Sequence, residues 1–198
     1  MPPDLVWYVA YGSNRRRERF LLYLRGGQAP GRSRVEPGAR NPAPPLADEA
    51  CVIDHALGFQ GWSKWWRGGV CFVDPSPTEA ATLCRRYLIT GEQFSDVLAQ
   101  ESGRPVGDDV DLSEVLSNGD AVVGPGKYDR ALLLDTVDDV PMVTFTTSTP
   151  VDELEFNAPS EAYAATIVRG LMQTHGLAHD EARTYITERW VAWEQWTT

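Results

Sequence analysis

The sequence has few of the residues and none of the motifs that mark several large protein classes. It contains three cysteines and three histidines, and its only lysines are Lys64 and Lys127. No apolar run is long enough to span a bilayer, and the opening Met-Pro-Pro-Asp lacks the basic segment of a secretory signal. The phosphate-binding P-loop, the dinucleotide-binding glycine pattern and the nucleophile elbow of serine hydrolases are all absent. These absences argue against membrane-spanning, secreted, nucleotide-binding and common serine hydrolase classes.

The few cysteines and histidines also argue against a metal site. Cys51, Cys71 and Cys84 are odd in number and show no C-x-x-C spacing. We therefore expect reduced thiols in strands rather than a disulfide framework or a zinc site. His175 and His179 are four residues apart, but the glycine after His175 interrupts the helix that would pair them. A cytoplasmic protein without metal or cofactor is the expectation.

The residues that are present describe an ordinary globular chain. It has 198 residues, 42% hydrophobic and 23% charged, which is enough for one domain over residues 1–198. The net charge of −10 argues against nucleic acid or an anionic membrane as the main partner.

The N-terminal segment predicts a strand, a tight turn and a helix in succession. Val6–Ala10 is apolar, a glycine turn follows at Gly12, and Arg15–Leu24 has helical periodicity. Gly12 permits positive φ or close approach of another group, and Ser13 or Asn14 can cap the helix. Backbone N–H groups at such a turn form a site for an oxyanion or a carboxylate.

The first turn of this helix is unusually basic. Arg15, Arg16, Arg17 and Arg19 put positive charge where the helix dipole favours negative charge. Either these long side chains extend into solvent, or a bound anion offsets their repulsion.

The rest of the chain predicts strands first and helices last. Alternating or continuous apolar patterns predict strands at 51–53, 68–73, 82–89, 128–134 and 141–147. Helical spacing predicts helices at 92–101, near 112–116, at 160–174 and in a C-terminal extension of about 178–198. Loops are expected at 26–45, 58–67 and 106–126, and the first and last of these could act as lids. The pair Gly68-Gly69 at a strand start suggests close backbone approach.

Glu101 is the main candidate for an acid or base. It ends the predicted helix 92–101, on the same side as Phe94, Val97 and Leu98. Burial of a carboxyl raises its pKa and suits it to proton transfer. The alternative is a surface glutamate at a frayed helix end.

Trp190, Trp193 and Trp196 recur every three residues on the last predicted helix. Such a stripe usually packs on a core or on another subunit. A homodimer is therefore an open alternative, and so is an interaction protein that docks through this helix.

Several of these segments resemble the γ-glutamylcyclotransferase-like family, from Trp7 to about Gly170. The segments are Tyr11-Gly12-Ser13-Asn14, Gly68-Gly69-Val70, Gln100-Glu101-Ser102-Gly103, Tyr128-x-Arg130 and Pro159-Ser160-x-x-Tyr163. The resemblance implies an α+β fold, a small mixed β-barrel or curled sheet with helices packed outside.

The resemblance also implies a site and a reaction. Tyr11 to Arg15 would bind the polar end of the substrate, Glu101 would be the acid/base group, and Tyr128 and Tyr163 would line the cavity. The reaction would cyclise a γ-glutamyl amine or γ-glutamyl amino acid to 5-oxoproline. The chain departs from the family at Arg15, where leucine is common, and in loops 26–45 and 106–126. The alternative on the same fold is a non-catalytic module that binds a small carboxylate or other anion.

Overall fold

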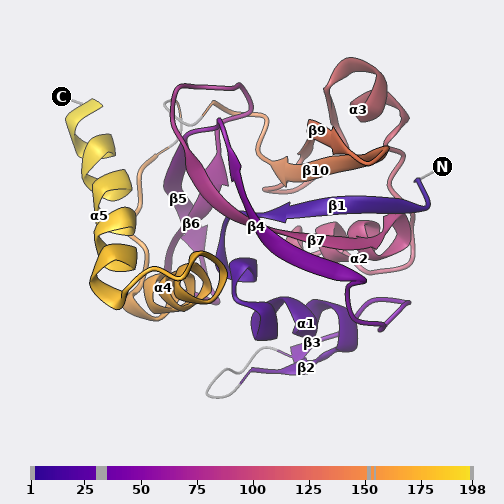
Figure 1. The fold of residues 1–198 in the computed structure, drawn as a ribbon, viewed down its shortest axis with the longest axis horizontal. Coiled ribbons are helices and arrows are strands. Elements are labelled where there is room, and N and C mark those ends of the chain that lie inside the picture. Colours follow the sequence, from indigo (N-terminus) through magenta and orange to yellow (C-terminus); the bar gives the residue numbers. More distant parts are fainter. Residues whose placement is uncertain (1–2, 30–34, 151–152, 154, 197–198) are drawn as a thin grey trace. The chain divides into compact units, whose positions relative to one another are not determined.

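A computed structural model describes residues 3–29, 35–150, 153 and 155–196, with side chains up to Arg189 (Figure 1). Its strands are β1 (Leu5–Ala10), β2 (Gly27–Gln28), β3 (Val35–Glu36), β4 (Ala47–Ile53), β5 (Leu57–Ser63), β6 (Gly68–Val73), β7 (Thr82–Thr90), β8 (Asp120–Val122), β9 (Arg130–Val137) and β10 (Val140–Thr146). Its helices are the 3-10 turn η1 (Ser13–Arg15), α1 (Arg17–Arg25), α2 (Gly91–Glu101), α3 (Ser113–Asn118), α4 (Glu161–His175) and α5 (His179–Trp196).

The chain divides into two compact units. The first comprises residues 1–10, 18–49 and 86–148, and the second comprises residues 11–17, 50–85 and 149–198. Strands β4 and β7 each have one end in the first unit and the other end in the second, because the unit boundaries fall within these strands. The architecture is α+β, with an open mixed sheet of order β4-β7-β1-β10-β9-β8. The expected curled sheet is confirmed, and the described strands do not close into the barrel that was its alternative.

The first unit holds most of this sheet. Strand β1 pairs with β10 in parallel, with Trp7 opposite Met142, and β10 forms an antiparallel hairpin with β9. Strand β8 extends the hairpin on its other side (Figure 1). A parallel pair such as β1–β10 needs a long connection between its strands. The residues between them supply that connection and include helix α2.

An aromatic cluster forms the core of the first unit. Tyr8 of β1 stacks on Phe145 with ring centroids 5.3 Å apart, and Phe20 stacks on Tyr87 at 4.0 Å. Phe94 of α2 meets Tyr8 edge to face at 5.9 Å. All five side chains are buried. Burial of this much aromatic surface fixes α1 and α2 against the strands, because aromatic residues contribute the largest areas to a core.

A buried carboxylate anchors α2 to two loops of the first unit. Asp96 is fully buried and accepts hydrogen bonds from the backbone N–H of Arg40 at 2.8 Å and from that of Gly107 at 3.3 Å. The Arg40 guanidinium lies 3.0 Å from Asp96 and 2.6 Å from the more exposed Asp109. The hydrogen bond to Asp96 is the main reason that the pKa of Arg40 is raised above its ordinary value. Helix α2 begins with a capping box formed by Thr90 and Gln93, so both its start and its middle are held.

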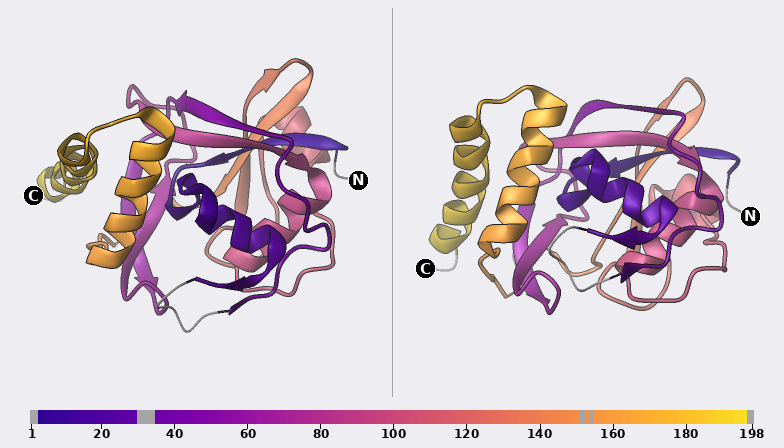
Figure 2. Two further views of the ribbon diagram at one scale, coloured as in Figure 1. Left: turned by 60° about the horizontal axis from the view of Figure 1, so that its bottom comes forward. Right: turned by 90° about the horizontal axis from the view of Figure 1, so that it is seen from below.

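The second unit is built from the hairpin β5–β6, the turn η1 and helices α4 and α5. Strand β6 is buried along its length, and β5 pairs with it antiparallel from Leu57 opposite Val73. Gly69 of β6 lies against the backbone near Asn157, so closely that a Cβ on Gly69 would be 1.9 Å from the Asn157 carbonyl oxygen. The close approach predicted for this glycine pair is confirmed. Figure 2 shows α4 and α5 side by side, and they are joined at Gly176, whose φ of 67° ends α4 as expected.

The structure corrects three of the expected loops. Residues 57–63 form β5. Its strand pattern was not recognised in the sequence, because Gly61 sits at a bulge with a φ of 57°. Its Trp62 is 69% exposed, and Trp65 beyond it is 44% exposed. The region 26–45 contains the pair β2–β3, and the region 106–126 contains β8 as well as the expected helix. Strands of two or three residues are too short to show periodicity.

The remaining predicted elements are confirmed to within a few residues. The three cysteines lie on strands as free thiols, although Cys51 is only half-buried. The side chains of Trp190, Trp193 and Trp196 lie outside the described residues. Among the described residues, no helix is long and apolar enough to cross a membrane.

Candidate functional site

The predicted anion-holding loop lies in the second unit and differs locally from expectation. Gly12, with φ −106° and ψ −140°, is itself the residue that precedes η1, and no side chain caps the turn. Ser13 and Asn14 are buried within the turn. The N–H of Arg15 donates to the Gly12 carbonyl, and that of Arg16 donates to the Ser13 carbonyl. The predicted cap at Ser13 or Asn14 is therefore wrong, and Gly12 does not adopt the positive φ that glycine permits.

Close approach, rather than a special backbone angle, explains the glycine. A Cβ on Gly12 would be 3.0 Å from the Tyr163 hydroxyl and 3.6 Å from the Cys71 Cβ. The backbone N–H of Cys71 donates to that hydroxyl at 3.1 Å. The Tyr163 ring also packs on Trp66, with centroids 4.8 Å apart. The resemblance implied that Tyr163 lines the cavity. In the structure, Tyr163 lies on α4, and its hydrogen bond to β6 holds its side chain beside the loop.

The arginine that departs from the family pattern points inward. Arg15 is fully buried, and its Nη2 donates to the Tyr11 carbonyl. Its Nε and Nη1 have no hydrogen-bond partner among the described residues. Gly170 of α4 leaves room for it, because a Cβ there would be 2.7 Å from the Arg15 Cβ. Extension into solvent is therefore wrong for Arg15, whereas Arg16 and Arg17 are half-buried.

Replacing Gly12 with alanine tests this arrangement. We expect Gly12→Ala to destabilise the protein by about 1–2 kcal/mol, because the new methyl group must displace the Tyr163 hydroxyl or the loop. In a Tyr163→Phe background the same change should cost less, since the hydroxyl is gone. Urea unfolding of the four proteins measures both effects. Equal costs in the two backgrounds would show that Tyr163 is not what excludes a side chain at position 12.

Glu101 lies in the first unit, as the last residue of α2, and is half-buried. The adjacent Gln100 donates to the Tyr23 carbonyl at 2.9 Å, which ties the end of α2 to α1. Arg19 of α1 lies 2.8 Å from Glu36 and donates to the Tyr23 hydroxyl at 2.8 Å. The sequence predicted that Glu101 lies on the buried face of α2. In the structure it is half-buried at the edge of that face, where it interacts electrostatically with Arg19.

The electrostatics of Arg19 connect it to Glu101. Burial by itself lowers the pKa of the Arg19 guanidinium, but the charges of Tyr23, Glu101 and Glu36 and the hydrogen bond to Glu36 more than offset this. The pKa of Arg19 is therefore raised, and the group is a permanent cation. Sequence reasoning treated Arg19 only as one of four basic residues in a helix. Its spacing of four residues from Tyr23 was the signal that these side chains share a face.

Tyr128 is buried in the first unit, next to the segment that follows Glu101. Its ring meets Phe145 edge to face at 5.3 Å, and Lys127 lies 4.7 Å over it. Its backbone carbonyl accepts a hydrogen bond from the Ser102 hydroxyl at 3.3 Å. The residue after Glu101 is thereby joined to the segment that leads into β9.

The structure thus groups the predicted residues in two sets. Glu101 and Tyr128 belong to the first unit, joined through Ser102, and the second unit holds the other set: Tyr11, Gly12, Ser13, Asn14, Arg15 and Tyr163. Among the described residues, no group of three or more His, Cys, Asp or Glu side chains could hold a metal ion.

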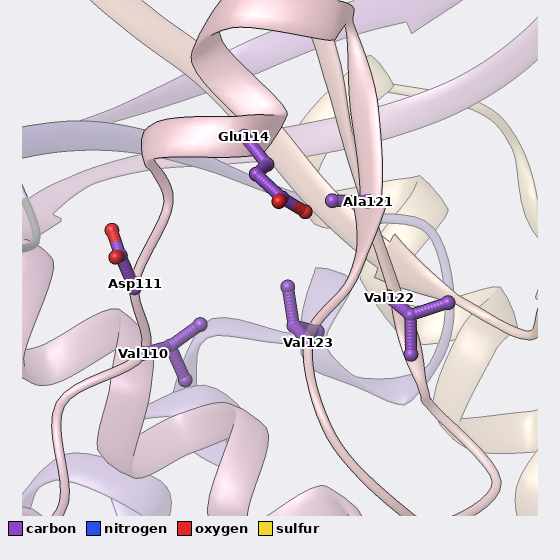
Figure 3. Close-up of a pocket in the computed structure, with 6 residues that line it drawn as sticks. All are labelled: Val110, Asp111, Glu114, Ala121, Val122 and Val123. Atoms are coloured by element: carbon purple, nitrogen blue, oxygen red, sulfur yellow. The ribbon is translucent and has the colours of Figure 1, made fainter.

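A separate hollow lies on the surface of the first unit. It has a volume of about 270 Å³ and is lined by Val110, Asp111, Glu114, Ala121, Val122 and Val123. Figure 3 shows the Glu114 side chain extending toward Ala121 and Val123. None of the predicted site residues lines it. The region 106–126, where the chain departs from the family pattern, forms its walls.

No protein-family model matches the sequence. The chain is 35% identical over 199 aligned positions to Histone deacetylase 5 of Arabidopsis thaliana, covering 91% of this chain and 30% of that protein. It therefore spans about 30% of the length of the curated relative it matches.

Solved structures share the fold at low identity. A structure described as gamma-glutamyl cyclotransferase matches with a TM-score of 0.54 and 16% identity, covering 91% of this chain and 86% of that one. YkqA from Bacillus subtilis matches with a TM-score of 0.51 and 16% identity, covering 94% of this chain and 54% of that one. The chain therefore has the γ-glutamyl cyclotransferase fold.

Proposed function

We propose that this chain is a γ-glutamylcyclotransferase-type enzyme, which releases 5-oxoproline and a free amine or amino acid from a γ-glutamyl compound. The observation that carries the proposal is the position of Glu101. In a chain with the γ-glutamyl cyclotransferase fold, this carboxyl group ends a well-anchored helix at the rim of the core, with a permanent cation nearby.

The proposed substrate carries its own nucleophile. Its α-amine attacks the γ-carbonyl carbon, closes a five-membered ring and expels the amine bonded to that carbon. Intramolecular attack of this kind is strongly favoured once the chain of the substrate is held in the folded geometry. The protein then has to accept a proton, deliver a proton and stabilise the oxyanion.

We assign the proton transfers to Glu101. Its carboxylate takes a proton from the α-ammonium of the substrate, and the resulting acid protonates the leaving amine, so the enzyme is regenerated without net change. The positive charge of Arg19 interacts favourably with a carboxylate at this position. Half-burial restricts water around the carboxyl group without removing it from the surface.

We assign the oxyanion, or the substrate's α-carboxylate, to the loop Gly12–Asn14. Backbone N–H groups before a helical turn are suitable donors to negative charge. The loop is rigid, because Ser13 and Asn14 are buried and the Tyr163 hydroxyl packs against Gly12. A preorganised donor is worth more in a transition state than a mobile one.

The test is a panel of γ-glutamyl amino acids and γ-glutamyl amides incubated with the purified chain. We expect 5-oxoproline and the free amine to appear in equal amounts for at least one member, detected by mass spectrometry. The matching α-glutamyl compounds are the control, because their side-chain carboxyl group offers no amide for the α-amine to attack. A panel without 5-oxoproline would contradict the proposal.

The outcome also separates the enzyme from a binding module. Calorimetric binding of γ-glutamyl compounds without turnover would favour a non-catalytic protein that holds a small carboxylate. The name of the plant relative does not decide between these two, because the aligned region is 30% of that protein and the name describes the whole.

A further inference from the structure

The second unit contains three thiols that the proposed reaction does not use. Cys51 lies on β4 and is half-buried, whereas Cys84 on β7 and Cys71 on β6 are buried. Strands β4 and β7 are hydrogen-bonded neighbours at the edge of the sheet. The position of Cys51 relative to Cys84 therefore depends on the register of these two strands.

Two contacts show the direction of this pairing and which side chains share a face. The N–H of Leu46 donates to the Leu88 carbonyl at 2.9 Å, and Glu49 lies 2.6 Å from Arg86. Partner positions advance along β4 as they recede along β7, so the strands are antiparallel. Two residues beyond the pair Glu49 and Arg86 come Cys51 and Cys84, and a step of two keeps a side chain on the same face.

The two thiols are in contact at this position. The side chains of Cys51 and Cys84 are hydrogen-bonded to each other. Opposed residues on antiparallel strands have Cα atoms about 4.5–5.5 Å apart, and disulfides span about 4.4–6.8 Å between Cα atoms. The Cys84 backbone is also held, because its carbonyl accepts a hydrogen bond from His175 Nε2 at 2.9 Å. The contact between the two side chains brings the sulfurs together for bond formation.

We propose that Cys51 and Cys84 are a reversible oxidation site, which forms a cross-strand disulfide in exchange with low-molecular-weight disulfides. In the first step the Cys51 sulfur displaces one thiol from the small disulfide and becomes a mixed disulfide. In the second step the Cys84 sulfur attacks Cys51, releases the second small thiol and closes the bond. Two protein thiols are oxidised and one small disulfide is reduced to two thiols, which take up both protons.

Exposure and charge set the order of these steps. Burial raises the pKa of Cys84 well above its ordinary value, and the hydrogen bond with Cys51 adds to this, while the charge of Arg15 acts in the opposite direction. Burial raises the pKa of Cys71 to about 11. Cys51 is the accessible member, so it meets the oxidant first, and Cys84 acts only once its partner has been activated.

Cys71 is expected to remain reduced. Burial keeps its thiol from external oxidants, and its backbone N–H is bonded to the Tyr163 hydroxyl. Cys71 makes the number of cysteines odd, and an odd number argued against a disulfide. The pair Cys51 and Cys84 was therefore not predicted from the sequence. Strand register is the property that distinguishes Cys51 and Cys84 from Cys71, and the cysteine spacings do not reveal it.

The test exposes the full chain to bis(2-hydroxyethyl) disulfide, which carries no γ-glutamyl group and cannot be confused with a substrate. The protein is then unfolded in N-ethylmaleimide, digested and mapped by mass spectrometry. We expect one labelled thiol, Cys71, and a linked peptide pair that contains Cys51 and Cys84. Treatment with dithiothreitol should restore three labelled thiols.

The wild-type peptide map assigns the linkage without any variant. As controls, Cys51→Ser should lose the linked pair and Cys71→Ser should keep it. A stable mixed disulfide on Cys51 with Cys84 still labelled, a linkage that includes Cys71, or three labelled thiols after oxidation would each overturn the proposal.

Discussion

We expect turnover of γ-glutamyl compounds to fall by a factor of at least about 100 in Glu101→Gln, while the protein stays folded. General acid–base catalysis contributes about 10²–10⁴ in rate, and glutamine keeps the size of the side chain but can neither accept nor deliver the proton. The fold should survive, because Glu101 is half-buried at a helix end and makes no part of the aromatic core. Steady-state release of 5-oxoproline measures the first effect, and the thermal midpoint measures the second.

A matched control lies on the same helix. Glu92 lies in the first turn of α2, its side chain is 42% exposed, and it lies 3.7 Å from Arg40. Glu92→Gln should keep turnover, since it removes one negative charge from the helix without touching the proposed base. If Glu101→Gln and Glu92→Gln retain equal activity, Glu101 is not the acid/base group. Glu101→Asp distinguishes the need for a carboxylate from the need for its exact position, because it keeps the carboxylate but shortens the side chain by one methylene.

The second large effect is on stability. We expect Asp96→Ala to lower the free energy of unfolding by about 3 kcal/mol, because the change leaves the Arg40 guanidinium and two backbone N–H groups without their buried acceptor. The value is at the low end for a buried pair, since the Arg40 side chain is 30% exposed and regains some hydration. Denaturation in urea at neutral pH measures the loss.

Asp109 provides the control for this prediction. It contacts the same guanidinium at 2.6 Å, but its side chain is 46% exposed. Solvent screens such a pair, so Asp109→Ala should cost less than about 1 kcal/mol. Similar losses in the two variants would show that burial of Asp96 does not govern the contribution. Because Asp96 lies on α2, its loss should also reduce any activity that depends on Glu101.

Much of the local structure could be read from the sequence because its signals are local. Helix α2 ends at Glu101 as predicted, Gly176 ends α4, and the close approach of Gly69 follows from the lack of a side chain. Strand β5 was missed because its glycines lower strand propensity, and pairing with β6 outweighs that local preference.

The candidate site shows the same division. The sequence by itself determined which residues are candidates for the proposed chemistry, Glu101 and the loop Tyr11 to Asn14, because residue type and position in a helix or turn are properties of short segments. Only the tertiary structure decided what surrounds them. The cation Arg19 acts on Glu101 from α1, Arg15 is buried, and Cys51 meets Cys84 across two strands. These relations depend on helix packing and strand register between distant segments, which no local pattern in one sequence encodes.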